Sequence, residues 1–587
     1  MLAVKAFIAF GGMLACCAVA LAAGSASSPL HNLSLRDRIA QMIVVRGYGD
    51  YPPSTNAEYE RFAHWIRDLH VGGFIVAGRI RNGNVIPAQP FEMVTFINRM
   101  QRLARTPLLV GSDFERGASM RVAETAKFPY MMAFGAAHDL AATRELGKAT
   151  AREAHALGIT WVFAPDADVN NNPDNPIINT RSFGEDPQAV AAEVSAFIDG
   201  AHADPGNYVL VTAKHFPGHG DTAVDSHLQL PRLDQPRDRI ETVELVPFRA
   251  AIQHGVDSIM TAHMAVPAFE PQPIPATVSH NVLTGLLRNE LGFKGLVVTD
   301  AMDMQAVTSL YSPGEAAVRA VEAGADVLLM PTNPEACIRG IEAAVKSGRI
   351  SRRRIDESAA KILAAKRRTG LFRSRFVKLD SITDDLEAAK LDELAQQVAR
   401  RAFTLVKDEK HLFPIPSPEA ACLTVMTDGD FSARGEILAD ALQRRLPGLQ
   451  VYQVNSRMTP GLLNLFAADA AHCQENYVAA FVTVAANRGS VALEGALNDF
   501  MNTLVQGPAP VALISLGSPY LLRDFPQVSS YAATFSSASS SELAAAQAIL
   551  GEISISGKLP VSIPGIAKIG EGLDVPAKRD RASNETQ

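Results

Sequence analysis

Six ionisable side chains lie within the fourteen residues from Lys214 to His227. This segment, KHFPGHGDTAVDSH, follows the apolar run 208–213 and is broken by glycine and proline, which favours a loop at the end of a buried strand. Asp225 and His227 are separated by one residue. In an extended loop, positions two apart project to the same side, so the carboxylate can hold one imidazole nitrogen while the other faces a substrate. The pair predicts a positioned donor and acceptor of protons.

A second carboxylate, Asp300, ends the apolar run 295–299. An acidic residue after so apolar a strand is either an ion-paired structural group or a catalytic one. The imidazoles and carboxylates of the 214–227 loop are also possible metal ligands, but their spacing fits no common ligand pattern, so no metal is expected. The side chains considered as ligands are His215, His219, Asp221, Asp225 and His227.

Eight short apolar runs recur at intervals typical of a strand, a loop and a helix. Continuous apolar character is typical of parallel strands buried on both faces. Eight such units predict a TIM-like (β/α)8 barrel, at whose mouth the polar groups that follow the runs would converge. A doubly wound open sheet is the competing architecture, but it would not gather groups from so many strands. The runs are 42–45, 74–77, 108–111, 161–164, 209–212, 258–261, 296–299 and 327–330, and the polar groups are Arg46, Asp113, Asp166, Lys214, His263 and Asp300.

Residues 36–373 are assigned to the barrel and residues 374–395 to a charged linker that wraps around it. Residues 396–570 are assigned to an α/β (αβα) sandwich, because strand and helix patterns alternate again. The polar tail, 571–587, is expected to be disordered. Sandwich strands are expected at 403–406, 422–426, 480–484 and 511–516, and clear helices of the chain at 187–203, 313–323, 354–369 and 541–550.

Residues 1–24 have the order of a secretory signal: Lys5, an apolar stretch, then small residues. We expect an exported chain, periplasmic or extracellular, without a transmembrane helix. A retained helix is the alternative, although Gly11 and Gly12 interrupt the short apolar stretch. Residues 13–16 also form an imperfect lipoprotein signal, which would place a lipid on Cys16. The net charge of −7 gives no indication of a nucleic-acid partner.

Beyond that segment the chain has three cysteines, Cys337, Cys422 and Cys473. They are far apart and odd in number, and no CxxC pair or Cys/His zinc spacing is present. These features predict three buried structural thiols rather than a disulfide framework.

The motif KHFPGHGDT, followed by Asp225-Ser226-His227, resembles the signature of family 3 glycoside hydrolases of the β-N-acetylglucosaminidase (NagZ-like) branch. The resemblance covers most of residues 36–370. The second domain resembles the sandwich of two-domain members, with the weaker closing motif GKLPVSIP at 557–564. Further agreeing segments lie at 163–170, 179–187, 260–263 and 292–300.

The resemblance implies a retaining exo-glycosidase that releases terminal β-linked N-acetylglucosamine from peptidoglycan fragments or chitin-like oligosaccharides. Asp300 would form the covalent glycosyl-enzyme, His227 would act as general acid and then as base, and Asp225 would orient and charge-balance His227. The positions implied to bind the sugar hydroxyls are Asp113, Arg181, Lys214 and His215. No cofactor is implied, and we expect a monomer.

Several of these residues also have structural interpretations. Lys214 and Arg181 can serve as ion-pair partners of Asp166, Asp168 or Glu185 at the barrel mouth. His263 is as readily a hydrogen-bonded core histidine as a ligand. The remaining polar residues of these motifs are assigned to loop shape or structure: Asp166, Asp168, His219 and Asp221.

One segment departs from the family pattern. Asp-Gln-Glu-Gly-Gly-Arg is replaced by Asp113-Phe114-Glu115-Arg116-Gly117-Ala118, although the later Arg121 is kept. The exchanges at 116 and 118 alter backbone freedom and charge beside the expected pocket. Phosphorolysis of the same bond, β-glucosidase activity and a non-catalytic sugar-binding protein are the alternative functions.

Overall fold

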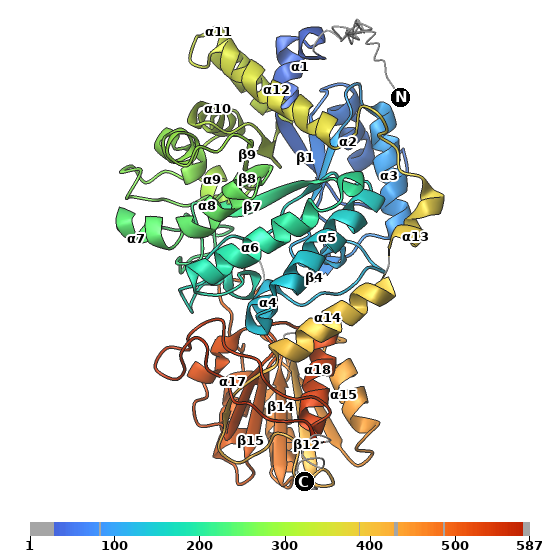
Figure 1. Cartoon of the computed structure of the whole chain (residues 1–587), viewed down its shortest axis with the longest axis vertical. Helices are drawn as coiled ribbons and strands as arrows, with labels where there is room; N and C mark the ends of the chain where they lie inside the picture. Colours follow the sequence, from blue (N-terminus) through green and yellow to red (C-terminus); the bar gives the residue numbers. More distant parts are fainter. Residues whose placement is uncertain (1–28, 82–83, 387, 428–431, 485–487, 579–587) are drawn as a thin grey trace, which may run out of the picture.

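The computed structural model describes residues 29–81, 84–386, 388–427, 432–484 and 488–578, which form two domains (Figure 1). The expected signal 1–24, the lipid site at Cys16 and residues 579–587 of the tail lie outside the described residues. Within the described part, no helix has the length and apolar character needed to cross a bilayer.

The N-terminal domain is an almost closed barrel of eight parallel strands, as predicted from the eight apolar runs. The strand order is β10-β1-β2-β5-β6-β7-β8-β9, and a parallel bridge between Val298 and Val327 joins the two ends of the sheet. The strands are β1 (Ile43–Gly47), β2 (Gly73–Val76), β5 (Leu109–Ser112), β6 (Trp161–Val162), β7 (Leu210–Phe216), β8 (Ser258–Thr261), β9 (Leu296–Thr299) and β10 (Leu328–Leu329).

Helices cover the outside of the barrel (Figure 1). α6 (Pro187–Ala201) begins where Asp186 accepts a hydrogen bond from the backbone of Ala189, and it buries Val190, Val194 and Phe197. The other helices of this domain are α1 (Leu35–Gln41), α2 (Ala57–Arg67), α3 (Pro90–Leu103), α4 (Met131–Ala137), α5 (Leu140–Ala156), α7 (Arg237–Thr242), α8 (Leu245–Gln253), Asn281–Glu290, α9 (Gln305–Thr308), α10 (Pro313–Ala323), α11 (Pro334–Lys346), α12 (Arg352–Arg368) and α13 (Ile382–Asp385).

The C-terminal domain is built on a mixed six-stranded sheet in the order β11-β16-β15-β14-β12-β13, with β11 antiparallel to β16. Successive residues of β14 (Glu475–Ala480) enter different cores: Tyr477 and Ala479 pack on one face, Val478 and Ala480 on the other. Both faces are therefore covered, as an αβα sandwich requires. The remaining elements are β11 (Thr404–Asp408), β12 (Ala421–Thr427), β13 (Gln450–Asn455), β15 (Val511–Ser515), β16 (Ser530–Ala533), α14 (Ala388–Ala402), α15 (Glu436–Gln443), α16 (Pro460–Ala470), α17 (Leu497–Gln506) and α18 (Ser539–Leu550).

Four features of the sheets differ from the sequence prediction. The strand expected at 480–484 is β14, which begins at Glu475 and ends at Ala480. Its start was missed because Glu475 and Asn476 are polar, although both are buried. β13 was missed because it is a half-exposed polar edge strand, and β16 because it is short. A hairpin of β3 (Arg79–Arg81) and β4 (Asn84–Ile86) was also missed.

The junction between the domains is apolar as well as polar. α4 belongs to the barrel domain by sequence, yet its Met132, Ala133 and Ala136 are part of a core cluster formed mostly by C-terminal residues. α14 lies beside α4 at this junction (Figure 1). α4 therefore packs into the core of the C-terminal domain as well as into that of the barrel.

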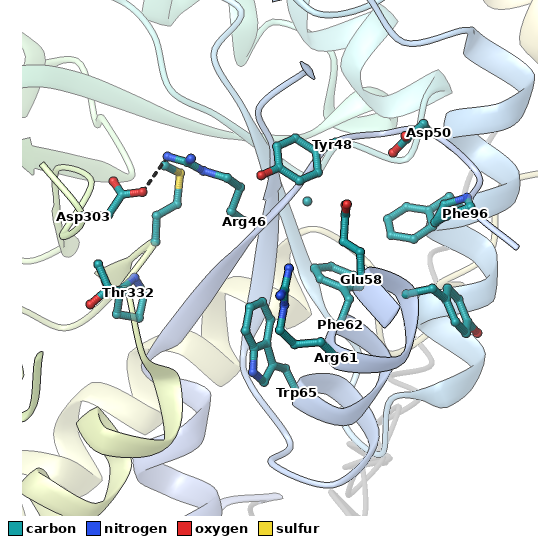
Figure 2. A pocket seen from close by; sticks show the side chains of 15 residues that line it. Arg46, Tyr48, Asp50, Glu58, Arg61, Phe62, Trp65, Phe96, Asp303 and Thr332 are labelled. Atoms are coloured by element: carbon teal, nitrogen blue, oxygen red, sulfur yellow. Dashed lines mark ion pairs between the residues drawn. The ribbon is translucent and has the colours of Figure 1, made fainter. Parts of the chain in front are cut away.

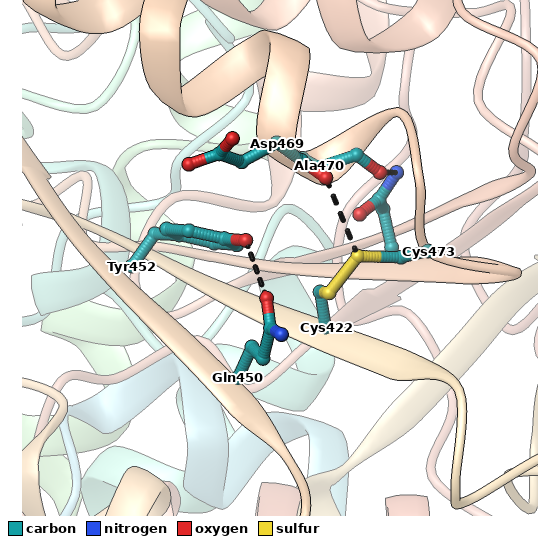
Figure 3. Close-up of a disulfide and its surroundings, with 7 residues drawn as sticks. Cys422, Gln450, Tyr452, Asp469, Ala470 and Cys473 are labelled. Atoms are coloured by element: carbon teal, nitrogen blue, oxygen red, sulfur yellow. Dashed lines mark hydrogen bonds between the residues drawn. A yellow bond between two sulfur atoms is a disulfide. The ribbon is translucent and has the colours of Figure 1, made fainter.

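Cys422 and Cys473 form a disulfide, so the expectation of three free thiols was wrong (Figure 3). Their Cα atoms are 5.9 Å apart, and only Cys337, which is buried, is free among the described cysteines. The parallel register of β12 and β14 places Cys422 opposite Asn476, three residues after Cys473. Spacing along the chain carries no trace of that register, and the bond was therefore missed.

Removing the disulfide should destabilise the C-terminal domain. Its two cysteines are 51 residues apart, and the chain-entropy model gives about 4 kcal/mol for a loop of that size. We expect the double variant Cys422→Ser/Cys473→Ser to lose that much free energy of unfolding in urea, with Cys337→Ser as the control for a buried thiol. A non-reduced digest without the cross-linked peptide pair would contradict the bond itself.

Candidate active site

The sequence-predicted site residues lie at the C-terminal mouth of the barrel, where the loops that follow the strands meet. β7 (Leu210–Phe216) is longer than expected, so Lys214 and His215 lie within the strand rather than in the loop that follows it. Asp300 directly follows β9, and Asp113 directly follows β5. Arg181 lies in the loop between β6 and α6. The barrel thus brings together side chains far apart in the sequence.

A buried ion network forms the centre of this mouth. The Lys214 ammonium, 2% exposed, lies 3.1 Å from Asp113 Oδ1 and 2.7 Å from Glu115 Oε1. Arg181 donates two hydrogen bonds to the Glu115 carboxylate, at 3.0 and 2.8 Å. Burial alone would lower the pKa of Lys214, but the charges of Glu115 and Asp113 raise it. Both cations are therefore ion-paired at the mouth; of the expected partners only Asp166 contacts them, and the shorter pairs are with Glu115 and Asp113.

Glu115 is the residue that sequence reasoning missed. In the sequence it is one member of the altered segment 113–118, but in the structure its carboxylate links Lys214 to Arg181. Although burial opposes its ionisation, the Arg181 and Lys214 charges hold the pKa of Glu115 well below its usual value. The signal that could have found it was its place two residues after Asp113 in the family motif.

Asp166 has the opposite electrostatic character. Neither of its carboxylate oxygens has a hydrogen-bond partner within the described structure, and its ion pair with Arg181 spans 3.2 Å. Burial raises the pKa of Asp166 to about 7, with the Glu115 charge adding to the effect and the Arg181 charge opposing it. Asp166 therefore holds a proton more readily than Asp113, Glu115 and Asp168, whose pKa values are lowered.

Asp168 orients the end of β7 and the start of the loop that follows it, residues 217–227. Its carboxylate lies 2.8 Å from His215 Nδ1 and accepts a 2.6 Å hydrogen bond from the backbone of His219. Burial opposes the charge on His215, but Asp168 raises the pKa of that imidazole. The His219 ring lies 2.7 Å from the Thr222 hydroxyl and 3.1 Å from that of Ser226, so it shapes the loop internally.

The surroundings of Asp300 favour its ionised carboxylate. Burial would raise its pKa, but the charges of His215 and His263 and a 2.7 Å hydrogen bond from the Ala301 backbone lower it to about 2. His263 is a hydrogen-bonded core histidine: Nε2 donates to the Ala301 carbonyl at 3.0 Å, and Nδ1 lies 2.7 Å from the Thr277 hydroxyl. Throughout the neutral pH range, Asp300 therefore carries an unprotonated carboxylate.

Asp225 and His227 adopt the predicted arrangement. The fully buried Asp225 carboxylate lies 2.8 Å from His227 Nδ1 and accepts a 2.8 Å hydrogen bond from the His227 backbone. The imidazole is 32% exposed, and its Nε2 has no hydrogen-bond partner in the described parts of the chain. The His227 charge also lowers the pKa of Asp300, so the two groups lie within electrostatic reach of each other.

The altered segment keeps the conformation that its glycine requires. Gly117 has φ +80°, and a Cβ there would lie 3.0 Å from the Phe128 ring. Arg116, which replaces a glycine, stacks over Tyr130 with its guanidinium carbon 4.8 Å from the ring centroid. Arg121 pairs with Asp113 at 3.1 Å, so a cation still contacts that carboxylate.

A cavity of about 240 Å³ opens at the mouth next to Asp303, three residues after Asp300 (Figure 2). Its rim carries an ion pair between Arg46 and Asp303, 2.7 Å long, and its walls include Tyr48, Trp65 and Phe96. Burial raises the pKa of Asp303, the Arg46 charge lowers it, and the Asp300 charge raises it further. The cavity therefore adjoins the site of Asp300.

One group of side chains has the geometry to hold a cation. Asp166, Asp168 and His215 offer ligand atoms that lie within 4.8 Å of one another. Asp166 already has the Arg181 guanidinium at 3.2 Å and the Lys214 ammonium at 3.8 Å. Positive charge at this position is thus supplied by side chains.

This barrel and its site match a known family. Residues 34–365 match the glycosyl hydrolase family 3 N terminal domain, and the chain belongs to glycoside hydrolase family 3. The family resemblance seen in the sequence is therefore confirmed.

Two similar proteins illustrate the range of relatives. The β-N-acetylglucosaminidase/β-glucosidase of Cellulomonas fimi is 31% identical over 388 residues, which cover 65% of each chain. The β-hexosaminidase A of Pseudoalteromonas piscicida is 38% identical over 266 residues, 41% of this chain and 43% of that protein. The chain thus spans less than two thirds of the length of either relative.

Solved structures extend the likeness to both domains. A family 3 β-N-acetylglucosaminidase from Paenibacillus sp. str. FPU-7 is 31% identical with a TM-score of 0.79, covering 90% of this chain and 99% of that one. A β-glucoside phosphorylase, BglX, is 24% identical with a TM-score of 0.80, covering 91% and 95%, and shares the fold.

Replacing Arg181 by Met should destabilise the protein in a pH-dependent way. Glu115 and Asp166 lose their guanidinium, and breaking a buried pair costs about 3–5 kcal/mol near pH 7. The pKa of Glu115 is lower in the folded wild type than in the unfolded chain. Its ionisation therefore stabilises the fold at pH values above the unfolded-state pKa, and this stabilisation is lost as pH falls through the folded-state pKa. In the variant the unpaired carboxylates take up protons on acidification, which removes their buried charge. The difference in free energy of unfolding between wild type and variant should therefore become smaller as the pH is lowered from 7 to about 4.5.

Urea unfolding at both pH values measures this gap. Arg237→Met is the control, because Arg237 pairs with Glu241 and Glu290 on the surface, where ion pairs contribute little. An Arg181→Met loss of equal size at both pH values would indicate lost packing instead of unpaired charge.

Proposed function

We propose that the protein is a retaining exo-β-N-acetylglucosaminidase, which hydrolyses terminal β-linked N-acetylglucosamine from peptidoglycan fragments or chitin-like oligosaccharides. The observation that carries this proposal is the presence, at one barrel mouth, of Asp300 directly after β9 and of His227 held by the buried Asp225. The choice of sugar is supported by the names of the relatives from Cellulomonas fimi and Paenibacillus.

In the first step, an Asp300 oxygen attacks the anomeric carbon and forms an ester bond with the sugar as the bond to the aglycone oxygen breaks. His227 donates its proton to that oxygen. In the second step, His227 takes a proton from water, the water oxygen attacks the anomeric carbon, and the Asp300 ester bond breaks. Asp300 returns as a carboxylate, and the products are free sugar and the aglycone alcohol.

The ion network supplies the sugar contacts in this proposal. The fixed charges of Lys214 and Arg181 and the Asp113 carboxylate offer donors and acceptors to ring hydroxyls. Such bonds strengthen as positive charge develops on the ring in the transition state. Asp225 keeps the imidazole in one orientation. The cavity beside Asp303 gives the aglycone a place outside this network.

Export to the periplasm or the cell exterior is part of the proposal. The Cys422–Cys473 disulfide supports it, because such bonds persist in oxidising compartments and are rare in the cytosol. Fractionation of cells that express the full chain, with fatty-acid labelling for a lipid on Cys16, tests the location. Exclusive recovery in the cytosol would contradict export.

The variant Asp300→Ala tests the nucleophile. We expect its hydrolysis of a chromogenic N-acetylglucosaminide to fall by about 10⁴-fold or more. Asp234→Ala is the control, since Asp234 is an exposed partner of Arg232. Assays with the matching glucoside, and with phosphate present, check the sugar and the reaction type. Sugar 1-phosphate among the products would indicate phosphorolysis, and retained activity of Asp300→Ala would exclude it as the nucleophile.

The variant His227→Gln tests the proton donor. A nitrophenolate leaves without protonation, whereas the alkoxide of a sugar does not. We therefore expect the variant to lose more kcat/KM on a β-linked N-acetylglucosamine disaccharide than on the nitrophenyl substrate, by about 10²-fold. Equal losses on the two substrates would contradict the role of His227 as general acid.

A further inference from the structure

The segment between β6 and α6, residues 163–186, carries Arg181 and contacts the 217–227 loop along one side. Asn175 donates hydrogen bonds to the backbone carbonyls of His219 and Gly220, at 2.8 and 3.1 Å. A Cβ at Gly220 would lie 1.8 Å from the Val169 carbonyl oxygen, so the two backbones touch. The place of this segment, named the β6–α6 loop below, therefore affects both the sugar-binding network and the loop that carries His227.

The C-terminal domain holds the same loop from its other side. Asn170 donates a 2.9 Å hydrogen bond to the Tyr520 hydroxyl, and Asn179 donates one of 3.4 Å to the Ser518 hydroxyl. The backbone of Glu185 donates to the Pro560 carbonyl at 3.0 Å. Asn170, Asn179, Ser518 and Tyr520 are all buried. These contacts span the domain boundary from one end of the loop to the other.

Asn179 holds a strained backbone conformation two residues before Arg181. Its φ is +43°, in the left-handed region that costs a non-glycine residue energy unless its surroundings enforce it. The Asn179 carbonyl accepts a 3.2 Å hydrogen bond from the Ser182 backbone, and its side-chain amide is the group that reaches Ser518. The strain is thus located where the C-terminal domain contacts the Arg181 segment.

The turn that reaches across, residues 517–520, is fixed by its own sheet. Gly517 has φ +142°, and a Cβ there would lie 2.0 Å from the Val482 carbonyl oxygen. The Ser518 backbone donates to that same carbonyl at 2.8 Å, and the Tyr531 hydroxyl donates to the Pro519 carbonyl at 2.8 Å. The turn therefore presents Ser518 and Tyr520 from a rigid base.

We propose that Ser518 and Tyr520 are positioning residues for the glycosidase reaction. Through Asn179 and Asn170 they fix the β6–α6 loop, and the loop fixes the Arg181 guanidinium against Glu115. The C-terminal domain thereby sets the geometry of the sugar-binding network without touching substrate. This inference rests on the proposed function, because it takes Arg181 as a group that binds the sugar.

The variant Tyr520→Phe removes one hydroxyl and leaves the Asn170 amide unpaired. We expect kcat/KM on the chromogenic N-acetylglucosaminide to fall about 10-fold, since small displacements of a binding group reduce catalysis strongly. Tyr477→Phe is the matched control: its buried hydroxyl donates to the Leu412 carbonyl at 2.6 Å inside the same domain. Both variants should lose similar free energies of unfolding, and only Tyr520→Phe should lose activity.

A double-mutant cycle tests whether the effect passes through Arg181. In an Arg181→Lys background, we expect Tyr520→Phe to change kcat/KM by less than about 2-fold. An undiminished 10-fold loss in that background would overturn positioning through Arg181. Wild-type kcat/KM in Tyr520→Phe would overturn the inference outright, whereas a wild-type enzyme that releases no N-acetylglucosamine would overturn the proposed function instead.

Asn179→Gly gives a second test that does not depend on destabilising the protein. Glycine relieves the positive φ while deleting the amide that reaches Ser518. We expect activity to fall while the free energy of unfolding changes little, because relief of the positive φ offsets part of the cost of the lost hydrogen bond and of the more flexible unfolded chain. Unchanged activity in this variant would contradict the positioning role.

Discussion

The pairing of Lys214 and Arg181 with Glu115 is the interaction on which the barrel mouth depends. Two cations cannot remain buried there unless carboxylates with good geometry balance them. Asp113, Glu115 and Asp166 come from the ends of two different strands, while Arg181 comes from a loop. The network therefore joins parts of the barrel that the hydrophobic core alone does not connect at this end.

The same network divides the acidic residues of the mouth by protonation. Glu115 accepts charged hydrogen bonds and its pKa is held low, whereas burial raises the pKa of Asp166, which has no hydrogen-bond partners in the described structure, to about 7. Asp300 stays ionised for another reason, because imidazoles and a backbone N–H surround it. Burial alone does not determine how a carboxyl group behaves here; the partners that accompany burial do.

The barrel was predictable because its signal is repeated. Eight apolar runs each reported a strand buried on both faces, so small errors of register did not change the conclusion. The Asp225–His227 contact was predictable because it is local. β14 was misplaced because Glu475 and Asn476, both buried, interrupt the apolar pattern. The Cys422–Cys473 bond depends on pairing between distant segments, which no spacing along the chain encodes. The contacts of Glu115 with Arg181 and Lys214 are also between distant segments, and only its place in the family motif marked it in the sequence.

The shared core at α4 limits how the two domains can move. Met132, Ala133 and Ala136 of the barrel pack in the same cluster as Phe535 and Leu559 of the C-terminal domain. A hinge that swung the domains apart would transfer these side chains from a dry interior into water, which the hydrophobic effect opposes. A hinge motion between the domains is therefore unfavourable, and access to the barrel mouth depends on local side-chain and loop motion there.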